Sequence, residues 1–480
     1  MSSIKKNFIY SSLLTTTTII FPILTYPYIS RVLGVSSFGL CNFIDSIINY
    51  FILFTTLGLS VTGIREIAKV KHDSIALNST FSSLITLSLV TTVIGSIILV
   101  IITFSVPQLF ENKGLMLFGL LKLIFNSFLI EWFYKGIEDF KYITTRSVIA
   151  KCLYIIAIFV FVRQKSDYPI YYLICVLLIV FNAIVNIVHS RKFVKFSFHN
   201  IRILPYLKPF VTIGAYNIMI SLYTTFNVAY LGFKCGDIQV GYYTTATKLF
   251  AIILAINTAF SGVMMPRMSS LIAEHKFEEF NHQLKLSIEL LLSFVFPIII
   301  FTIFFAPEII DVVSGSGYEG AITPMRIIAP LFFVVGYNQI LIIQTLMPLN
   351  RDKIIFRNSM YAAILGLILN ILLVNTLECI GSAIVWICSE TFLMIASVIN
   401  LKKTCPLCFP RKLIVKNIIT MIPLSVILSG IYFCSMNSII KICISGLIVI
   451  AYCLILHLYF IKDGIIYRTI AARISLRHNC

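Results

Sequence analysis

The chain has 480 residues, of which 59% are hydrophobic and 12% are charged, and its mean hydropathy is +0.95. A water-soluble domain of this size could not bury so much apolar surface, so the composition excludes a soluble protein and predicts an integral membrane protein. The formal net charge of +18 would favour a nucleic-acid partner only if the basic residues formed one patch.

Apolar runs of about 20 residues recur along the chain, each long enough to cross or nearly cross a hydrocarbon core of roughly 30 Å. They predict an all-α membrane protein with about 14 transmembrane helices, or 12 to 14 if some segments lie on the membrane surface. The first run follows Lys5 and Lys6, but no small-residue cleavage site comes after it, which predicts an uncleaved helix. The runs are 8–30, 38–64, 80–106, 115–134, 147–162, 168–189, 209–233, 240–265, 286–306, 325–347, 355–374, 380–399, 413–434 and 439–460.

Basic residues concentrate in alternate loops between these runs. With the N-terminus inside, 27 of the 38 lysines and arginines, Arg146 among them, fall in inner segments, and five fall in the opposite loops. The positive-inside rule then predicts that both termini are cytoplasmic. The excess charge is explained by topology, so no nucleic-acid partner is predicted.

Catalytic and metal-binding patterns are weak in this sequence. The cysteines lie mostly inside apolar runs, and the one close pair, Cys405 and Cys408, lacks the further ligands that a zinc site needs. No phosphate-binding G-x-x-x-x-G-K loop occurs, and the longest predicted outer loop, 307–324, is too short for a soluble catalytic platform. We therefore predict no enzyme activity, no cofactor and no metal.

Two stretches about 200 residues apart resemble each other. In each, an LG pair is followed by an aromatic-flanked glycine, and 26 residues separate Gly39 from Arg65 and Gly241 from Arg267. This repeat predicts two six-helix lobes related by a pseudo-two-fold axis along the membrane normal, a common design of alternating-access transporters. The predicted parts are residues 1–195 with helices 1 to 6, 196–403 with helices 7 to 12, and 404–480 with two further helices and a basic cytoplasmic tail.

Ionisable groups inside apolar runs are costly and need an explanation. Asn42, Asp45 and Asn49 are spaced to share one helical face, which should point toward the protein interior. The repeat places Lys248 one position from the equivalent of Asp45, so the two could meet across a central cleft or each could have a local partner. Lys122 lies well inside another run.

Longer segments carry a family resemblance. The run PYISRVLGVSSFG, continuing to LGLSVTGIREIAK, resembles the N-terminal signature of the Wzx-type polysaccharide flippases of the multidrug/oligosaccharidyl-lipid/polysaccharide exporter superfamily. WFYKGIEDFKYITTRS, VGYYTTATKLF, MMPRMSSL and MRIIAPLFFVVGYNQILIIQTLMPLNRDK are similar to later parts of these proteins. The resemblance covers most of residues 10–400.

The resemblance implies a flippase that moves an undecaprenyl-diphosphate-linked oligosaccharide repeat unit across a bacterial inner membrane, for O-antigen or capsule assembly. Its partners would be this lipid-linked substrate, membrane lipids and other polysaccharide-assembly proteins. We assign substrate binding and ion coupling to separate residues. The predicted substrate-binding residues are Arg31, Lys122, Lys248, Arg326 and Asn49, and the predicted ion-coupling residues are Asp45 and Glu131.

Other interpretations stay open at this point. Arg31 and Arg326 could reach lipid headgroups, and Glu131 could be an interfacial anchor. Arg31 also has only Ala229 at its aligned place in the second stretch, so the cationic residues are not paired symmetrically. A drug/cation antiporter of the same superfamily, favoured by an acidic cavity, and a membrane polysaccharide polymerase or ligase are the alternative functions.

Overall fold

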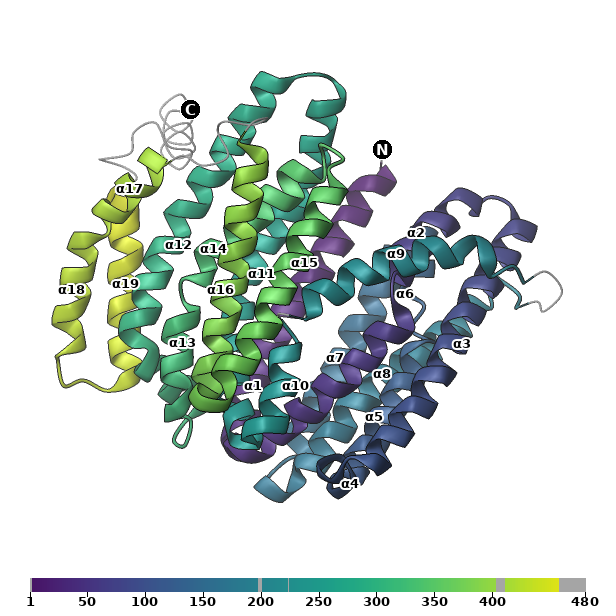
Figure 1. Ribbon diagram of the computed structural model, residues 1–480, viewed down its shortest axis with the longest axis horizontal. Coiled ribbons are helices and arrows are strands. Elements are labelled where there is room, and N and C mark those ends of the chain that lie inside the picture. The colour runs from purple at the N-terminus through teal and green to yellow at the C-terminus, as the bar shows by residue number, and fades with distance from the viewer. Residues whose placement is uncertain (1, 197–200, 223, 403–410, 457–480) are drawn as a thin grey trace. The chain divides into compact units, whose positions relative to one another are not determined.

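The computed structural model describes residues 2–196, 201–222, 224–402 and 411–456, and all regular elements in these ranges are helices (Figure 1). Ten described segments are long and apolar enough to cross a membrane, or eleven if one bent pair of helices counts as a span. The predicted all-α membrane class is therefore confirmed, and the protein crosses the membrane several times.

The number of spans depends on how two very long segments are divided. Ile20–Val70 and Asp352–Leu401 each exceed the length of a single span. The first has non-helical backbone at Gly34 and the second at Glu378, where φ is 51° and ψ is −127°. The count of fourteen helices stays a prediction, as does the pseudo-two-fold axis.

Contacts within the chain define two compact units, residues 1–244 and 245–480, here called unit 1 and unit 2. The predicted lobe boundary near residue 195 stays a prediction. Cys405, Cys408 and the basic tail lie outside the described residues. The helices of unit 1 are α1 (Ser2–Thr56), α2 (Leu59–Val70), α3 (Ser74–Ser105), α4 (Pro107–Glu111), α5 (Lys113–Asn126), α6 (Glu131–Gly136), α7 (Phe140–Phe161), η1 (Lys165–Asp167), α8 (Tyr168–Ser190), α9 (Leu204–Ser221), α10 (Phe226–Cys235) and the start of α11 (Asp237–Ala273).

Unit 2 begins within α11 and contains two π-helical segments, η3 and η4. Its further helices are α12 (Phe277–Ser314), η2 (Glu319–Ala321), α13 (Ile322–Ile328), α14 (Leu331–Leu341), η3 (Ile342–Leu346), α15 (Asp352–Leu369), η4 (Asn370–Val374), α16 (Asn375–Leu401), α17 (Arg411–Thr420), α18 (Ile422–Tyr432) and α19 (Ser438–Ile455).

Buried aromatic side chains fix α6 in unit 1. Phe81 of α3 contacts Trp132 and Phe133 of α6, with ring centroids 5.8 and 5.0 Å away. On α2, a Cβ added at Gly63 would lie 2.7 Å from the Trp132 ring, so only glycine lets α2 approach this closely. The packing holds the start of α6, where Glu131 lies, in one place.

A glycine separates the two halves of α1. Gly34 has φ 69° and ψ 170°, a conformation that other L-residues rarely adopt, so it can connect two predicted spans with almost no loop. Gly236, between α10 and α11, has nearly the same backbone, with φ 82° and ψ −179°. The turn glycine of the second stretch is therefore Gly236 and not the glycine of its LG pair. When Gly34 is aligned with Gly236, the residue that matches Arg31 in the second stretch is Phe233 and not Ala229.

The other two glycines of the repeat bring α1 and α11 into close contact inside unit 1. A Cβ at Gly39 would lie 1.8 Å from the carbonyl oxygen of Asp237, and one at Gly241 would lie 2.4 Å from that of Val35. Neither position can take a larger residue without separating the helices. Gly39 and Gly241, the two glycines that define the repeat, therefore lie where α1 and α11 pack closely against each other.

The helices after residue 410 pack on α12 in unit 2. Phe305 of α12 contacts a buried cluster with Met421, Leu424 and Leu428. A buried ion pair joins Glu308 of α12 to Lys441 of α19, with Oε1 and Nζ 2.9 Å apart and side chains 10% and 11% exposed. In Figure 1, α18 and α19 lie beside each other next to α12.

Two predictions about loops are wrong. The expected outer loop 307–324 is mostly helical, because α12 bends at Phe305, where φ is −100° and ψ is 18°, and then resumes as a helix to Ser314, and α13 begins at Ile322. Arg146, expected in an inner loop, lies inside α7 and is 5% exposed. In both places a charged or proline-containing sequence was interpreted as a loop, whereas packing against neighbouring helices keeps the segment helical.

Candidate functional site

Three of the predicted site residues meet in unit 1. Lys122 on α5 donates to Asp45 Oδ1 at 2.6 Å and to Asn49 Oδ1 at 2.9 Å, both on α1. Asn49 Nδ2 donates to the other Asp45 oxygen at 3.0 Å, and the hydroxyl of Tyr172 on α8 lies 3.3 Å from Asp45 Oδ1. We call these four residues the Asp45 group. Asp45 and Asn49 are one helical turn apart, which lets one ammonium bind both.

A small residue brings the three helices of this group together. Gly119 precedes Lys122 by three residues on α5, and a Cβ there would lie 2.5 Å from the Ile48 side chain on α1 and 3.5 Å from the Tyr172 hydroxyl. The Lys122 side chain is 12% exposed, whereas that of Asp45 is 34% exposed. The ammonium is therefore buried behind a more accessible carboxylate.

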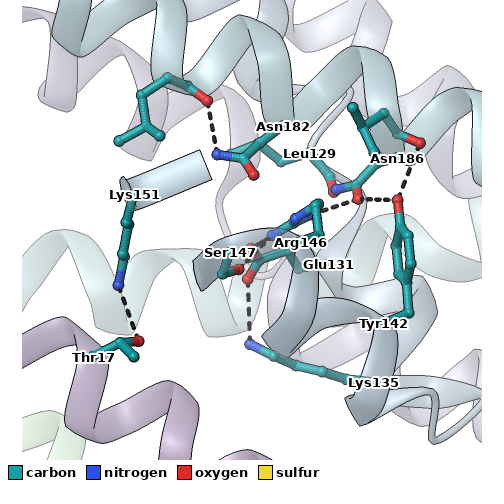
Figure 2. Close-up of polar contacts among 12 residues, drawn as sticks. Thr17, Leu129, Glu131, Lys135, Tyr142, Arg146, Ser147, Lys151, Asn182 and Asn186 are labelled. Carbon is teal, nitrogen blue, oxygen red and sulfur yellow. Dashed lines mark hydrogen bonds and ion pairs between the residues drawn. The ribbon is translucent and has the colours of Figure 1, made fainter. Parts of the chain in front are cut away.

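A second polar group lies among α6, α7 and α8 (Figure 2). Arg146 Nη2 is 2.8 Å from Glu131 Oε1 and 3.0 Å from Ser147 Oγ, and Arg146 Nη1 donates to Asn186 Oδ1. The Lys135 ammonium lies 3.7 Å from the other Glu131 oxygen. We call these five residues the Glu131 group. The Arg146 side chain is 4% exposed and that of Glu131 is 38% exposed, so here too a buried cation lies behind an accessible carboxylate.

Local backbone geometry positions Glu131. The preceding residue, Ile130, has φ 35° and ψ 32°, a left-handed conformation that is unfavourable for a β-branched side chain. Ile130 is 1% exposed, and its burial holds this conformation. The result is a sharp start to α6 that directs the Glu131 carboxylate toward Arg146.

Further polar residues extend the Glu131 group. Asn186 is fully buried, donates to the Leu129 carbonyl and accepts from the Tyr142 hydroxyl at 3.1 Å. Lys151 on α7 donates to Thr17 of α1 at 3.5 Å, and its ammonium lies 5.6 Å from the Phe21 ring centroid. Figure 2 shows Lys151 on the opposite side of Arg146 from Tyr142.

One face of α8 serves both groups. Tyr172, Cys175, Asn182, Asn186 and His189 are spaced so that they lie along a single stripe of the helix. Tyr172 joins the Asp45 group and Asn186 joins the Glu131 group. The side-chain oxygen of Asn182, between them, is buried without a hydrogen-bond partner in the described structure.

The remaining predicted residues are not placed in either group. Arg31 is exposed on α1 just before the Gly34 break, and Lys248 is half-buried on α11. Arg326 on α13 donates through Nε to the carbonyl of Ile303 at 3.0 Å. That carbonyl lacks its usual helical partner because Pro307, four residues on, has no N–H. Arg326 thus stabilises the bend of α12.

Sequence reasoning missed several members of this site. From the sequence, Arg146 is expected in an inner loop, and Lys151 lies inside the run 147–162 without being singled out. The signal that could have found them is the α8 stripe, since Tyr172, Asn182 and Asn186 recur at helical spacing inside a run that is otherwise apolar. Two polar faces on neighbouring helices predict a polar interior between them.

Unit 2 contains a buried carboxyl in a different setting. Glu390 on α16 is 7% exposed, and Asn338 Nδ2 of α14 donates to its Oε2 at 2.7 Å and to its backbone carbonyl at 3.0 Å. Within the described ranges no lysine or arginine lies within ion-pair distance of Glu390. The Trp386 indole N–H is close by but lacks the geometry of a hydrogen bond.

Comparison with known proteins places this arrangement in a family. The profile of the family described as "Polysaccharide biosynthesis protein" matches residues 4–272, more than half of the chain. The chain belongs to this family. The resemblance to polysaccharide flippases seen in the sequence is thereby confirmed, and residues 213–376 also match the family described as "MatE".

Two relatives and one solved structure are similar to this chain. The Escherichia coli (strain K12) protein "Putative O-antigen transporter" is 28% identical over 411 residues, which cover 83% of this chain and 98% of that protein. "Probable low-salt glycan biosynthesis flippase Agl15" of Haloferax volcanii is 27% identical over 198 residues, 41% of each chain. The structure "Lipid II flippase MurJ, inward closed conformation" aligns with a TM-score of 0.76 at 17% identity, covering 95% of this chain and 99% of that one, which shows a shared fold.

Proposed function

We propose that this protein is a flippase for lipid-linked glycans, and that it moves an undecaprenyl-diphosphate-linked oligosaccharide repeat unit across a bacterial inner membrane for O-antigen or capsule assembly. Membership of the family and the similarity to an O-antigen transporter and a glycan flippase support the class of substrate. Alternating access between the two lobes, with both termini in the cytoplasm, completes the proposal. Other polysaccharide-assembly proteins would deliver the substrate and receive it.

The observation that carries the proposal is the surplus of positive charge embedded in unit 1. Lys122, Arg146 and Lys151 lie inside candidate membrane-spanning helices, and among the described residues the carboxylates that form ion pairs with Lys122 and Arg146 are those of Asp45 and Glu131. Charges in the hydrocarbon region are costly, so a surplus of one sign indicates an interaction with a ligand of the opposite sign. A diphosphate supplies that charge. A drug/cation antiporter would favour the reverse balance.

The geometry supports a mechanism of counter-ion exchange. The Lys122 ammonium is bound by an accessible carboxylate, and an approaching phosphate offers the same charge and stronger hydrogen-bond acceptors. A proton taken up by Asp45 would weaken its hold on Lys122 and free the ammonium for the phosphate. Glu131 and Arg146 form a second pair of the same kind. Ion coupling through Asp45 and Glu131 would then follow, because carboxylate and phosphate compete for the same cation and proton uptake by the carboxylate favours the phosphate.

The other predicted residues take supporting roles in this proposal. Asn49 would keep Lys122 in place while the carboxylate is displaced, since it binds both. Arg31 and Lys248 would contact phosphate or sugar at other stages of transport. Arg326 has the weakest case, because its guanidinium is engaged in the bend of α12.

The experiment compares single and double variants in cells that depend on this protein for surface polysaccharide. Lys122→Gln and Asp45→Asn each leave one uncompensated partner, whereas the double variant has a neutral, hydrogen-bonded pair of similar shape. If Lys122 binds substrate, the double variant reaches normal membrane abundance but polysaccharide export stays at least tenfold below that of the native protein. Recovery of export in the double variant would show that the pair is only structural and would contradict the proposal.

A further inference from the structure

A groove of about 310 Å³ lies on unit 2 between α15 and α16, two helices that pack along each other. One end of the groove is polar, with Arg357, Asn358 and Asn400. Its walls are apolar and include Tyr361 and Ile399. The residues that line the groove belong to neither polar group described above, and the proposed transport reaction does not account for them.

Buried amides build the polar end. Asn358 is 2% exposed, donates to Ser397 Oγ at 3.4 Å and accepts from Asn400 Nδ2 at 3.3 Å. The Asn400 oxygen accepts in turn from Arg357 Nη2 at 2.8 Å. This chain of hydrogen bonds fixes the guanidinium at the mouth of the groove, so the order needed for binding is already present in the fold.

Among the described residues, no carboxylate balances the charge of Arg357. Its one hydrogen-bond partner in the described part of the chain is the neutral Asn400 amide, and no described carboxylate forms an ion pair with it. A guanidinium has five N–H donors in a planar fork that matches the oxygens of a phosphate. Lys353 precedes Arg357 by one turn on the same face and adds a second positive charge.

The walls suit a hydrocarbon chain that reaches through one leaflet. Ile395 is 50% exposed and Ile399 64%, and exposed apolar residues continue along α15 with Ile364 at 48% and Ile368 at 50%. At about 1.5 Å per residue, the helix from Arg357 to Ile368 extends roughly 16 Å. That is about half of a hydrocarbon core of roughly 30 Å.

We propose that this groove binds an anionic glycerophospholipid, with its phosphate on Arg357 and an acyl chain along the apolar walls. The positive-inside pattern puts this end of α15 on the cytoplasmic side, where anionic lipids attract basic residues next to the membrane. The net positive charge at the mouth favours an anionic headgroup over a zwitterionic one. The bound lipid neutralises Arg357 and fills the groove between α15 and α16.

Native mass spectrometry of the full chain in detergent tests this assignment, with phosphatidylglycerol as the probe and phosphatidylcholine for comparison. We expect phosphatidylglycerol to bind more tightly, and Arg357→Gln to weaken its binding about tenfold, as expected for loss of a charge-assisted hydrogen bond. Arg351→Gln is the matched control, because it removes one positive charge at the same helix end without lining the groove. Inorganic phosphate at millimolar concentration should not bind measurably.

A site-specific measurement keeps the test independent of overall lipid uptake. The chain has two tryptophans, Trp132 and Trp386, which can be replaced by phenylalanine, while Phe392→Trp places a reporter in the groove wall. Brominated phosphatidylglycerol at a small mole fraction in detergent should quench this reporter, and Arg357→Gln should reduce the quenching. Equal behaviour of the Arg357 and Arg351 variants would overturn the proposal. So would equal binding of phosphatidylcholine, or preferential binding of a polyprenyl phosphate.

Discussion

Asp45 of unit 1 and Glu390 of unit 2 are both carboxyl groups inside membrane-spanning helices, but their partners differ. Asp45 binds the Lys122 ammonium at 2.6 Å and is 34% exposed, whereas Glu390 binds the Asn338 amide at 2.7 Å and is 7% exposed. The two embedded carboxylates described in unit 1, those of Asp45 and Glu131, each form an ion pair with a basic side chain. The partner of the Glu390 carboxyl is instead the neutral amide of Asn338. The comparison shows that Asp45 is paired with a cation and accessible, as the proposed counter-ion exchange requires, whereas Glu390 is paired with a neutral amide and buried.

The largest effect should follow from removing the most buried cation of unit 1. Arg146→Gln leaves Glu131 without its main cation and removes one of the two donors to the Asn186 oxygen, so the free energy of unfolding should fall by about 3–5 kcal/mol. Thermal unfolding of the purified protein in detergent measures this loss. A loss below 1 kcal/mol would mean that Lys135 already compensates Glu131, which would contradict a buried-cation role for Arg146.

Lys122→Gln should destabilise less, by about 2–3 kcal/mol, because the Asp45 carboxylate is a third exposed and can be partly hydrated. Asp45→Asn in the same background should restore most of this stability, since both charges are then gone. The double-mutant cycle, measured by thermal unfolding, gives the coupling between the two residues. If the two single variants lose stability additively in the double variant, Lys122 and Asp45 do not interact in the folded protein.

Glu390→Gln should change stability by less than about 1 kcal/mol, because glutamine can still accept a hydrogen bond from Asn338 and no cation loses a partner. Asn338→Leu is the informative counterpart, since it leaves the carboxyl buried with no hydrogen bond and should cost about 2–3 kcal/mol. Unfolding measured for the two variants side by side tests the amide-partner description. A large loss in Glu390→Gln would point to a cation partner instead.

The smallest effect is expected at a surface ion pair in the turn after α11. The Lys276 ammonium lies 2.7 Å from Glu274, and its hydrogen bonds, together with that of Ser270, lower the pKa of the Glu274 carboxyl. A lowered pKa contributes stability above the unfolded pKa and loses it as pH falls. Glu274→Gln should therefore match the native protein closely at pH 7, and the remaining difference should narrow toward pH 4 in thermal unfolding. A clear loss of stability in Glu274→Gln at pH 7 would contradict the expectation that exposed ion pairs stabilise the protein much less than buried ones.

Part of the candidate site was predictable because it lies on single helices. Asp45 and Asn49 share a face by spacing alone, and Lys122 was recognisable as a lone charge in an apolar run. Which cation binds Asp45 could not be predicted, since the repeat suggested Lys248 and the close packing at Gly119 brings Lys122 to it. Arg146 was misplaced because a helix that starts with polar residues looks like a loop until its neighbours are known.

The sequence by itself determined the membrane class, the family, the Gly34 turn and the polar face of Asp45, because hydropathy, glycine conformation and helical spacing act over a few residues. Tertiary structure decided how charges pair, since Lys122 meets Asp45, and Arg146 meets Glu131, across different helices. It also decided that α12 bends at Phe305 and resumes as a helix at Pro307, where Arg326 satisfies the carbonyl that the proline leaves open. The packing of the helices decides which charged residues far apart in the chain form ion pairs, and local sequence patterns do not contain this information.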